Sequence, residues 1–150
     1  MASALAQGAY LGRCGKLLCM TAAPAHDDPV PQKLTHDGLA EPLLIACLCA
    51  AWCRTCGDYR ATLDTVTREF GDRVRVLWVD IEDDEEALGG VDVVDFPTLL
   101  IARGDHIAFY GPVLPHAQAL RQLTERGLLG ALGEVRHPAL VGLPGRIGRL

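Results

Sequence analysis

The pattern of apolar and polar positions predicts a strand followed by a helix near the middle of the chain. Residues 43–49 form a short, unbroken apolar run, which is typical of a strand buried on both faces. Beyond it, apolar residues recur at steps of four, three and four. These positions are Tyr59, Leu63, Val66 and Phe70. Such spacing is the core-facing stripe of an amphipathic helix, and we expect this helix to begin at Cys53.

The same pattern predicts further elements towards the C-terminus. The expected order is a strand over 74–80, a short helix with the acidic run 82–86 at its start, a hairpin of strands over 99–102 and 107–110, and a helix over 115–126. This alternation of strands and helices predicts an α/β fold. It places about four strands in one central mixed sheet with helices on both faces.

Composition divides the chain into three parts. Residues 1–31 are rich in Ala, Gly and Pro, so we expect a flexible extension, in which Met20 could itself be the true start. The domain is expected over 32–127, followed by a loosely ordered Gly/Leu/Arg-rich tail over 128–150. No apolar run of about 18 residues and no continuous apolar leader is present, so we predict a cytoplasmic protein without a membrane span.

Charge and cysteine usage narrow the class of function. The formal net charge of -5 argues against a general nucleic-acid binder. The six cysteines are not spread as in a secreted disulfide scaffold, because four of them lie between residues 47 and 56. This clustering favours a reducing compartment with one reactive site.

The reactive site is predicted at Trp52-Cys53-Arg54-Thr55-Cys56. Two cysteines separated by two residues can both lie in the first turn of a helix and close a disulfide ring. Free N–H groups at a helix start stabilise a thiolate, so Cys53 is the expected nucleophile. Cys56, one turn along and more buried, is expected to resolve the mixed disulfide. Arg54 adds positive charge beside Cys53, or is a solvated surface residue.

Three segments follow one family pattern. They are Ala51 to Cys56 after a strand, Val79-Asp80 in the next strand, and Phe96-Pro97-Thr98 before the hairpin. Together they resemble the thioredoxin family over about residues 42–127. The resemblance implies a thioredoxin-like fold and a cis-proline, Pro97, that faces the disulfide.

The resemblance also implies a groove for substrates. Phe96 and Pro97 would shape it, so that an extended substrate segment pairs with the backbone of Phe96. Trp52 would cover the active site, and Arg54 and Thr55 would contact the substrate between the two cysteines.

The sequence departs from the thioredoxin pattern beneath the motif. Thioredoxins usually place a buried Asp six residues before the first cysteine, and here that position is Cys47. The usual Lys partner falls near Trp78, and a commonly aromatic position is Cys49. Arg54 and Thr55 replace the Gly-Pro of thioredoxins proper. The buried acid–base pair is therefore absent, which predicts slow or specialised turnover.

Cys47 and Cys49 allow more than one interpretation. They alternate with Leu48, so they share one face of a strand. They are either small buried hydrophobes or modulators of the pair, with Cys47 lying beneath Cys56 and exchanging disulfides with it or tuning its proton loss. Four clustered cysteines also suggest a zinc or iron–sulfur site. Two of the four ligands would have to come from a buried strand, which is an awkward geometry for one metal centre, so no metal is expected.

These observations together predict a thioredoxin-like protein disulfide oxidoreductase that acts in cell redox homeostasis. Its partners would be protein thiols and disulfides, with a reductase or thiol donor to reset the pair. No cofactor, nucleic acid or membrane is expected, and we expect a monomer. The alternatives are a thioredoxin-fold binding or assembly module with little redox turnover and, after it, a cysteine-cluster metal-binding protein.

Overall fold

The computed structural model describes residues 41–150. The predictions for the extension 1–31, for a start at Met20 and for Cys14 and Cys19 lie outside the described residues. No helix in the described part of the chain is long and apolar enough to span a membrane.

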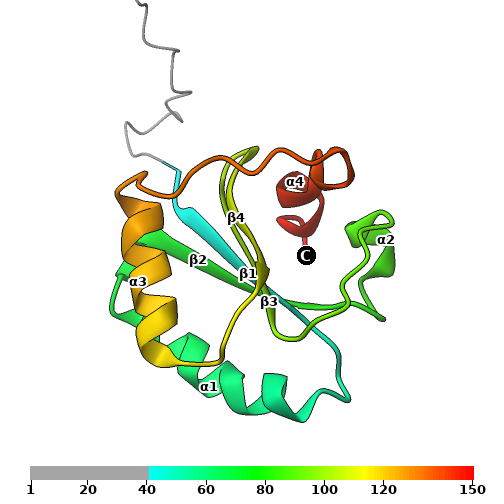
Figure 1. The fold of residues 1–150 in the computed structure, drawn as a ribbon, viewed down its shortest axis with the longest axis horizontal. Helices are drawn as coiled ribbons and strands as arrows, with labels where there is room; N and C mark the ends of the chain where they lie inside the picture. The colour runs from blue at the N-terminus through cyan, green and yellow to red at the C-terminus, as the bar shows by residue number, and fades with distance from the viewer. Residues whose placement is uncertain (1–40) are drawn as a thin grey trace, which may run out of the picture. The chain divides into compact units, whose positions relative to one another are not determined.

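The centre of the described region is a four-stranded mixed sheet in the order β2-β1-β3-β4 (Figure 1). The strands are β1 (Leu43–Cys49), β2 (Val74–Asp80), β3 (Thr98–Arg103) and β4 (His106–Pro112). β1 pairs with β2 in parallel and with β3 in antiparallel orientation, and β3 and β4 form an antiparallel hairpin. The predicted mixed sheet of about four strands is confirmed.

β1 is a continuous apolar strand because both of its faces are buried. Its alternate residues belong to two separate cores, since successive side chains of a strand point to opposite faces. Leu43, Ile45, Cys47 and Cys49 contribute to one core, and Leu44, Ala46 and Leu48 to the other. The two cysteines therefore lie on the face that packs against α1 (Arg54–Arg68).

Helices cover both faces, as the sequence predicts (Figure 1). α1 and α3 (Ala117–Leu128) pack on the face that carries the cysteines, through an apolar stripe that includes Leu63 and Leu120. α2 (Glu85–Leu88) lies on the other face and buries Leu88 there. Single-turn 3-10 helices occur at Gly71–Arg73 and Pro138–Leu140.

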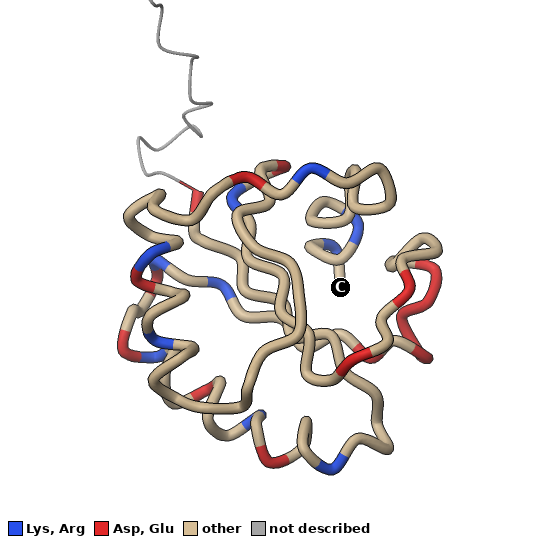
Figure 2. Tube along the Cα trace, viewed as in Figure 1, with Lys and Arg blue, Asp and Glu red and all other residues tan. Residues whose placement is uncertain are grey.

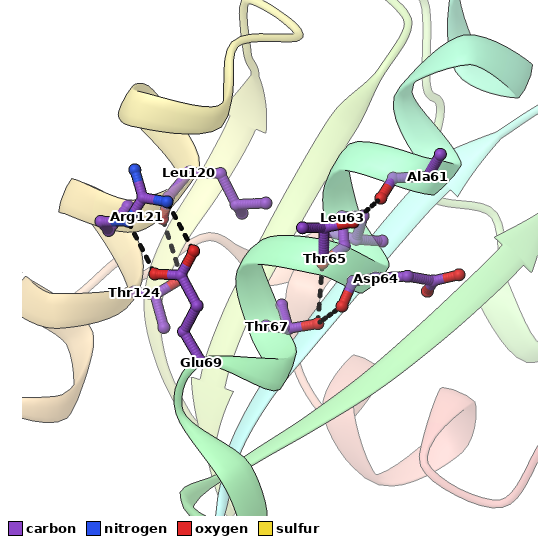
Figure 3. A network of polar contacts seen from close by, with 9 residues as sticks. All are labelled: Ala61, Leu63, Asp64, Thr65, Thr67, Glu69, Leu120, Arg121 and Thr124. Atoms are coloured by element: carbon purple, nitrogen blue, oxygen red, sulfur yellow. Dashed lines mark hydrogen bonds and ion pairs between the residues drawn. The ribbon is translucent and has the colours of Figure 1, made fainter.

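A polar clamp joins the two helices on the cysteine face (Figure 3). The guanidinium of Arg121 in α3 donates two hydrogen bonds, of 2.8 and 2.6 Å, to the carboxylate of Glu69 at the end of α1. These hydrogen bonds hold the pKa of Glu69 below its ordinary value. The C-terminal end of α1 is thereby linked to α3 by a partly exposed ion pair, in addition to the apolar packing of the two helices.

The prediction of a loosely ordered tail after residue 127 is wrong. The chain forms α4 (Leu143–Ile147), which packs on the α2 face of the sheet and buries Leu143 and Ile147 completely. The tail belongs to the same compact unit as the sheet. The physical reason is that this face would otherwise expose the even-numbered side chains of β1, and α4 covers them together with Leu140.

One arginine attaches α4 to α2. Arg146 donates hydrogen bonds to the carbonyl oxygens of Ala87 at 2.9 Å and Leu88 at 3.1 Å. These carbonyls lie at the C-terminal end of α2, where carbonyl groups lack partners within the helix. Gly89 then leaves the helix with a left-handed φ of 62°, a conformation that glycine adopts without steric cost.

Candidate functional site

Cys53 is the N-cap of α1, at the start of the helix that follows β1. Its backbone is extended, with φ -77° and ψ 102°, and its N–H donates to the carbonyl of Ala50 at 2.9 Å. The Sγ atom accepts a hydrogen bond from the backbone N–H of Cys56 at 3.3 Å. An unpaired helix-terminal N–H thus points at the sulfur, the arrangement that favours a thiolate. The side chain is half-buried, so it is reachable from solvent.

Cys56 lies in the first turn of α1 and is only 1% exposed. Burial raises the pKa of its thiol, and hydrogen bonds with the thiols of Cys49 and Cys53 raise it further. Cys56 therefore holds its proton while Cys53, closer to the surface, is the accessible sulfur. This is the asymmetry expected of a resolving cysteine and a nucleophile.

Cys47 and Cys49 extend the group of thiols inwards. Their Sγ atoms are 3.4 Å apart, and both side chains are completely buried. The hydrogen bond with Cys47 and burial raise the pKa of Cys49, while its hydrogen bond with Cys56 acts in the opposite direction. Of the two strand thiols, Cys49 is the one whose pKa responds to Cys56, and Cys47 is its 3.4 Å neighbour. We call these four residues, Cys47, Cys49, Cys53 and Cys56, the thiol cluster.

Tyr59 borders the thiol cluster. Its side chain packs in the core as the helical stripe predicts, but its hydroxyl is buried without a hydrogen-bond partner. Burial raises the pKa of this hydroxyl, and the electrostatic influence of the nearby Cys47 and Cys49 raises it further. The apolar spacing predicts a packing role for Tyr59 and contains no signal for the unused hydroxyl.

Trp52 and Phe96 bring the motif together with the segment that precedes β3. Their rings meet edge to face, with centroids 5.5 Å apart and planes at 82°. Phe96 is partly buried against the core that contains the thiol cluster, whereas Trp52 is 65% exposed. The Phe96–Pro97 peptide bond is cis, and the carbonyl of Pro97 accepts from the N–H of Val113 at 3.0 Å.

The remaining predicted site residues lie at the surface or behind the motif. Arg54 and Thr55 are exposed in the first turn of α1. Trp78 is partly buried behind the cluster, with the guanidinium of Arg60 5.0 Å from its ring centroid.

Acidic residues border one side of the site, where Figure 2 shows a concentration of red around α2. The indole N–H of Trp52 donates to Glu82 at 3.0 Å, which links the motif to this acidic segment. Asp80 and Asp84 order the segment, because Asp84 accepts from the N–H of Asp80 and Asp80 accepts from the N–H of Glu82, each at 3.0 Å. The acidic run is evident in the sequence, but its contact with Trp52 is not, because the two are 30 residues apart.

Across residues 41–150, no three His, Cys, Asp or Glu side chains are grouped so that they could hold a metal ion. The chemistry that the described groups can perform is the formation and exchange of sulfur–sulfur bonds.

Comparisons with known proteins agree with this geometry. The family model named Thioredoxin matches residues 32–123, and the chain therefore belongs to the thioredoxin family. Thioredoxin of Bacillus subtilis (strain 168) is 25% identical over 89 residues, which is 59% of this chain and 86% of that protein. Thioredoxin of Listeria monocytogenes is 26% identical over 68 residues, covering 45% of this chain and 66% of that protein.

Solved structures show the same fold. The germline-specific thioredoxin Deadhead of Drosophila melanogaster superimposes with a TM-score of 0.52 at 20% identity, over 57% of this chain and 81% of that one. Chloroplastic thioredoxin z superimposes with a TM-score of 0.53 at 20% identity, over 60% and 81%. The thioredoxin-like fold predicted from the sequence is thus confirmed, and family membership supports thiol–disulfide oxidoreductase chemistry in general.

Proposed function

We propose that this protein exchanges disulfides with protein substrates, with Cys53 as the nucleophile and Cys56 as the resolving thiol. The observation that carries the proposal is the position of Cys53. Its half-buried sulfur caps α1 and accepts the N–H of Cys56 at 3.3 Å. A helix N–H directed at an accessible sulfur lowers the free energy of the thiolate, which is the reactive form.

The exchange proceeds in two balanced steps. The Cys53 thiolate attacks one sulfur of a substrate disulfide, so the Cys53–substrate bond forms and the other substrate sulfur leaves as a thiolate. Cys56 then loses its proton and attacks Cys53, so the Cys53–Cys56 bond forms and the second substrate thiolate leaves. The substrate gains two electrons, which a reductase or thiol donor must return to the protein. The same steps in reverse oxidise a substrate.

Substrates would bind across the edge formed by the motif and the segment before β3. Trp52 and Phe96 would form its apolar part, the buried Pro97 would set the course of the backbone beside Phe96, and Arg54 and Thr55 would border it. The structure adds exposed Leu114, the residue after the Val113 that bonds to Pro97. A largely exposed Trp packed against Phe96 is the kind of apolar surface that marks a protein contact. The cysteine clustering favours a reducing compartment, and we propose a monomer in the cytoplasm.

The test is a trapping experiment with matched variants. In Cys56→Ser the first step proceeds but the second cannot, so stable mixed disulfides with substrate proteins accumulate on Cys53. In Cys53→Ser none form at that site. Trapped partners should be released by dithiothreitol and identified by mass spectrometry. Equal trapping by the two variants, or none by either, would refute the assignment.

One observation favours a second function, a binding module with little redox turnover. Cys56 is buried, its pKa is raised, and the residues beneath it are thiols rather than a carboxylate. Proton loss from Cys56 is therefore unfavourable, and resolution is slow. Activity of Cys53→Ser in the cell separates the two functions, because a binding module keeps its role without the nucleophile, whereas an exchange enzyme loses it.

A further inference from the structure

We infer that Cys49 is a third redox-active thiol, which takes Cys56 from the Cys53–Cys56 disulfide by internal exchange. The inference rests on the proposed function, because it begins from that disulfide. It extends the function by giving the oxidised protein two isomers, one with an accessible disulfide and one with a shielded disulfide.

Each thiol of the cluster has at least one other thiol as a neighbour. All four cysteines belong to the core between the sheet and α1. Cys53 Sγ accepts the N–H of Cys56 at 3.3 Å, and the Sγ atoms of Cys47 and Cys49 are 3.4 Å apart. The thiols of Cys49 and Cys56 are close enough to shift each other's pKa. Cys56 therefore has a neighbouring thiol on each side, Cys53 towards the surface and Cys49 towards the core. A disulfide at Cys56 can move between these two neighbours by a small displacement of sulfur, without opening the fold.

The position of Cys49 in β1 favours a disulfide with Cys56 over a disulfide with Cys47. Cys47 is paired with Trp78 of β2 and Leu99 of β3, so its backbone is held on both sides. Cys49 is the last residue of β1 and is paired only with Asp80 of β2. Residues two apart in a strand have Cα atoms about 6.6 Å apart, near the upper limit for a disulfide, so a Cys47–Cys49 bond would distort a central strand.

The exchange step is balanced without an outside oxidant. The Cys49 thiolate attacks Sγ of Cys56, the Cys49–Cys56 bond forms, and the Cys53–Cys56 bond breaks. Cys53 leaves as a thiolate at the helix N-terminus, so the negative charge moves from Cys49 to Cys53. One disulfide is present before the step and one after it, so only its position changes.

The surroundings determine the rate of this step. The raised pKa of Cys49 keeps it protonated near neutral pH, so the exchange is slow there and quickens as the pH rises. A thiolate formed in the cluster needs a hydrogen-bond donor, since an unpaired buried charge is unfavourable. The buried hydroxyl of Tyr59 lies in the same core as the cysteines and has no hydrogen-bond partner in the reduced protein.

The consequence concerns access to the disulfide. Cys49 and Cys56 are both at most 1% exposed, so a bond between them is protected from bulky thiols. Cys53 in that isomer is a free, half-buried thiol. In the shielded isomer, substrate thiols would therefore be unable to reach the disulfide until the exchange reverses.

The test uses a convenient arrangement of tryptic sites. Trypsin cleaves after Lys33, Arg54 and Arg60, which places Cys47, Cys49 and Cys53 in peptide 34–54 and Cys56 in peptide 55–60. The full-length Cys53→Ser variant is equilibrated with oxidised glutathione between about pH 7 and 9, quenched in acid, alkylated and digested. Oxidation of two thiols to one disulfide converts one molecule of oxidised glutathione into two of glutathione.

We expect peptides 34–54 and 55–60 to be linked in most Cys53→Ser molecules, at a rate that rises about tenfold per pH unit. Adding Cys47→Ala should preserve the link, whereas adding Cys49→Ala should reduce it at least tenfold. Cys56 that stays free or glutathionylated in Cys53→Ser overturns the inference, and so does a link that survives Cys49→Ala.

A second measurement needs no variant. In the oxidised wild-type protein, fragmentation of peptide 34–54 shows which cysteine carries the alkyl group. Label on Cys53 in part of the molecules supports the shielded isomer, whereas label confined to Cys47 and Cys49 contradicts it. If wild-type protein forms no bond to Cys53 at all, the proposed function itself fails, which is a different outcome from the failure of Cys49 alone.

Discussion

The sulfur of Cys53 accepts a hydrogen bond from the backbone N–H of Cys56 at 3.3 Å. One backbone group therefore links the two cysteines of the motif before any disulfide exists. The same turn of α1 exposes Cys53 partly and buries Cys56, so the two cysteines differ in accessibility, and burial raises the pKa of Cys56.

The resolving step should depend strongly on pH. In a mixed disulfide Cys53 has no proton to lose, so Cys56 is the attacking thiol that titrates. Its pKa is raised by burial, and the thiolate fraction should therefore grow about tenfold per pH unit between about pH 6 and 8. Single-turnover release of a peptide from its mixed disulfide with Cys53, quenched in acid and counted by mass spectrometry, measures this slope. A rate independent of pH would show that another group removes the proton.

The reduced protein should lose stability in alkali. Cys49 and Cys56 have pKa values raised above the ordinary value of 9.0, so the folded state holds their protons more tightly than the unfolded state. This stabilisation is complete below about pH 8 and declines above 9, by about 1 kcal/mol for each thiol between pH 9 and 10. Urea unfolding in the presence of reductant measures it, with Cys49→Ala as the control that should show a shallower decline. Equal slopes in the two proteins would contradict the account.

Tyr59→Phe should leave the reduced protein as stable as before, or stabilise it by up to about 1 kcal/mol. The hydroxyl is buried without a partner, so its removal recovers a desolvation penalty while the ring packing is retained. Tyr59→Ala is the matched contrast, because it leaves a cavity and should cost about 3 kcal/mol or more. A loss above about 1 kcal/mol in Tyr59→Phe, read from urea unfolding, would mean that the hydroxyl has a partner in solution.

The C-terminal helix should contribute directly to the stability of the domain. Leu143 and Ile147 are completely buried against the sheet, so Leu143→Ala and Ile147→Ala should each lower the free energy of unfolding by about 2–5 kcal/mol. Val141 lies in the same segment but is 74% exposed, and Val141→Ala should change stability by less than about 0.5 kcal/mol. Similar small effects at all three positions would show that α4 does not pack as described.

Much of the fold was predictable because its signals are local. The unbroken apolar run of β1 and the helical stripe of α1 depend only on neighbouring residues, and both elements lie where the pattern places them. α4 was missed because its two buried residues, Leu143 and Ile147, lie among Gly142, Pro144 and Gly145, a composition typical of a loop. The interaction that orders it, with the opposite face of the sheet, is not local.

The candidate site also has some features that depend on adjacent residues and others that depend on contacts between distant segments. The two cysteines of the motif and their neighbour Trp52 are adjacent in sequence, so their common position at a helix start follows from spacing. Which strand thiol meets Cys56 was not predictable, because Cys47 and Cys49 share a face and only the three-dimensional course of β1 and α1 separates them. The bond from Trp52 to Glu82 likewise depends on a contact between separate loops.

The measurement that tests the central claim most directly is a redox titration of the full chain in glutathione buffers, with alkylated thiols counted and located by mass spectrometry. The account predicts a two-electron transition in which Cys53 and Cys56 are the first thiols to become protected. It also predicts that Cys53→Ser removes this transition. If Cys53 stays alkylatable across the whole range from about -300 to -120 mV, the exchange function is wrong, because thiol–disulfide proteins titrate within that range.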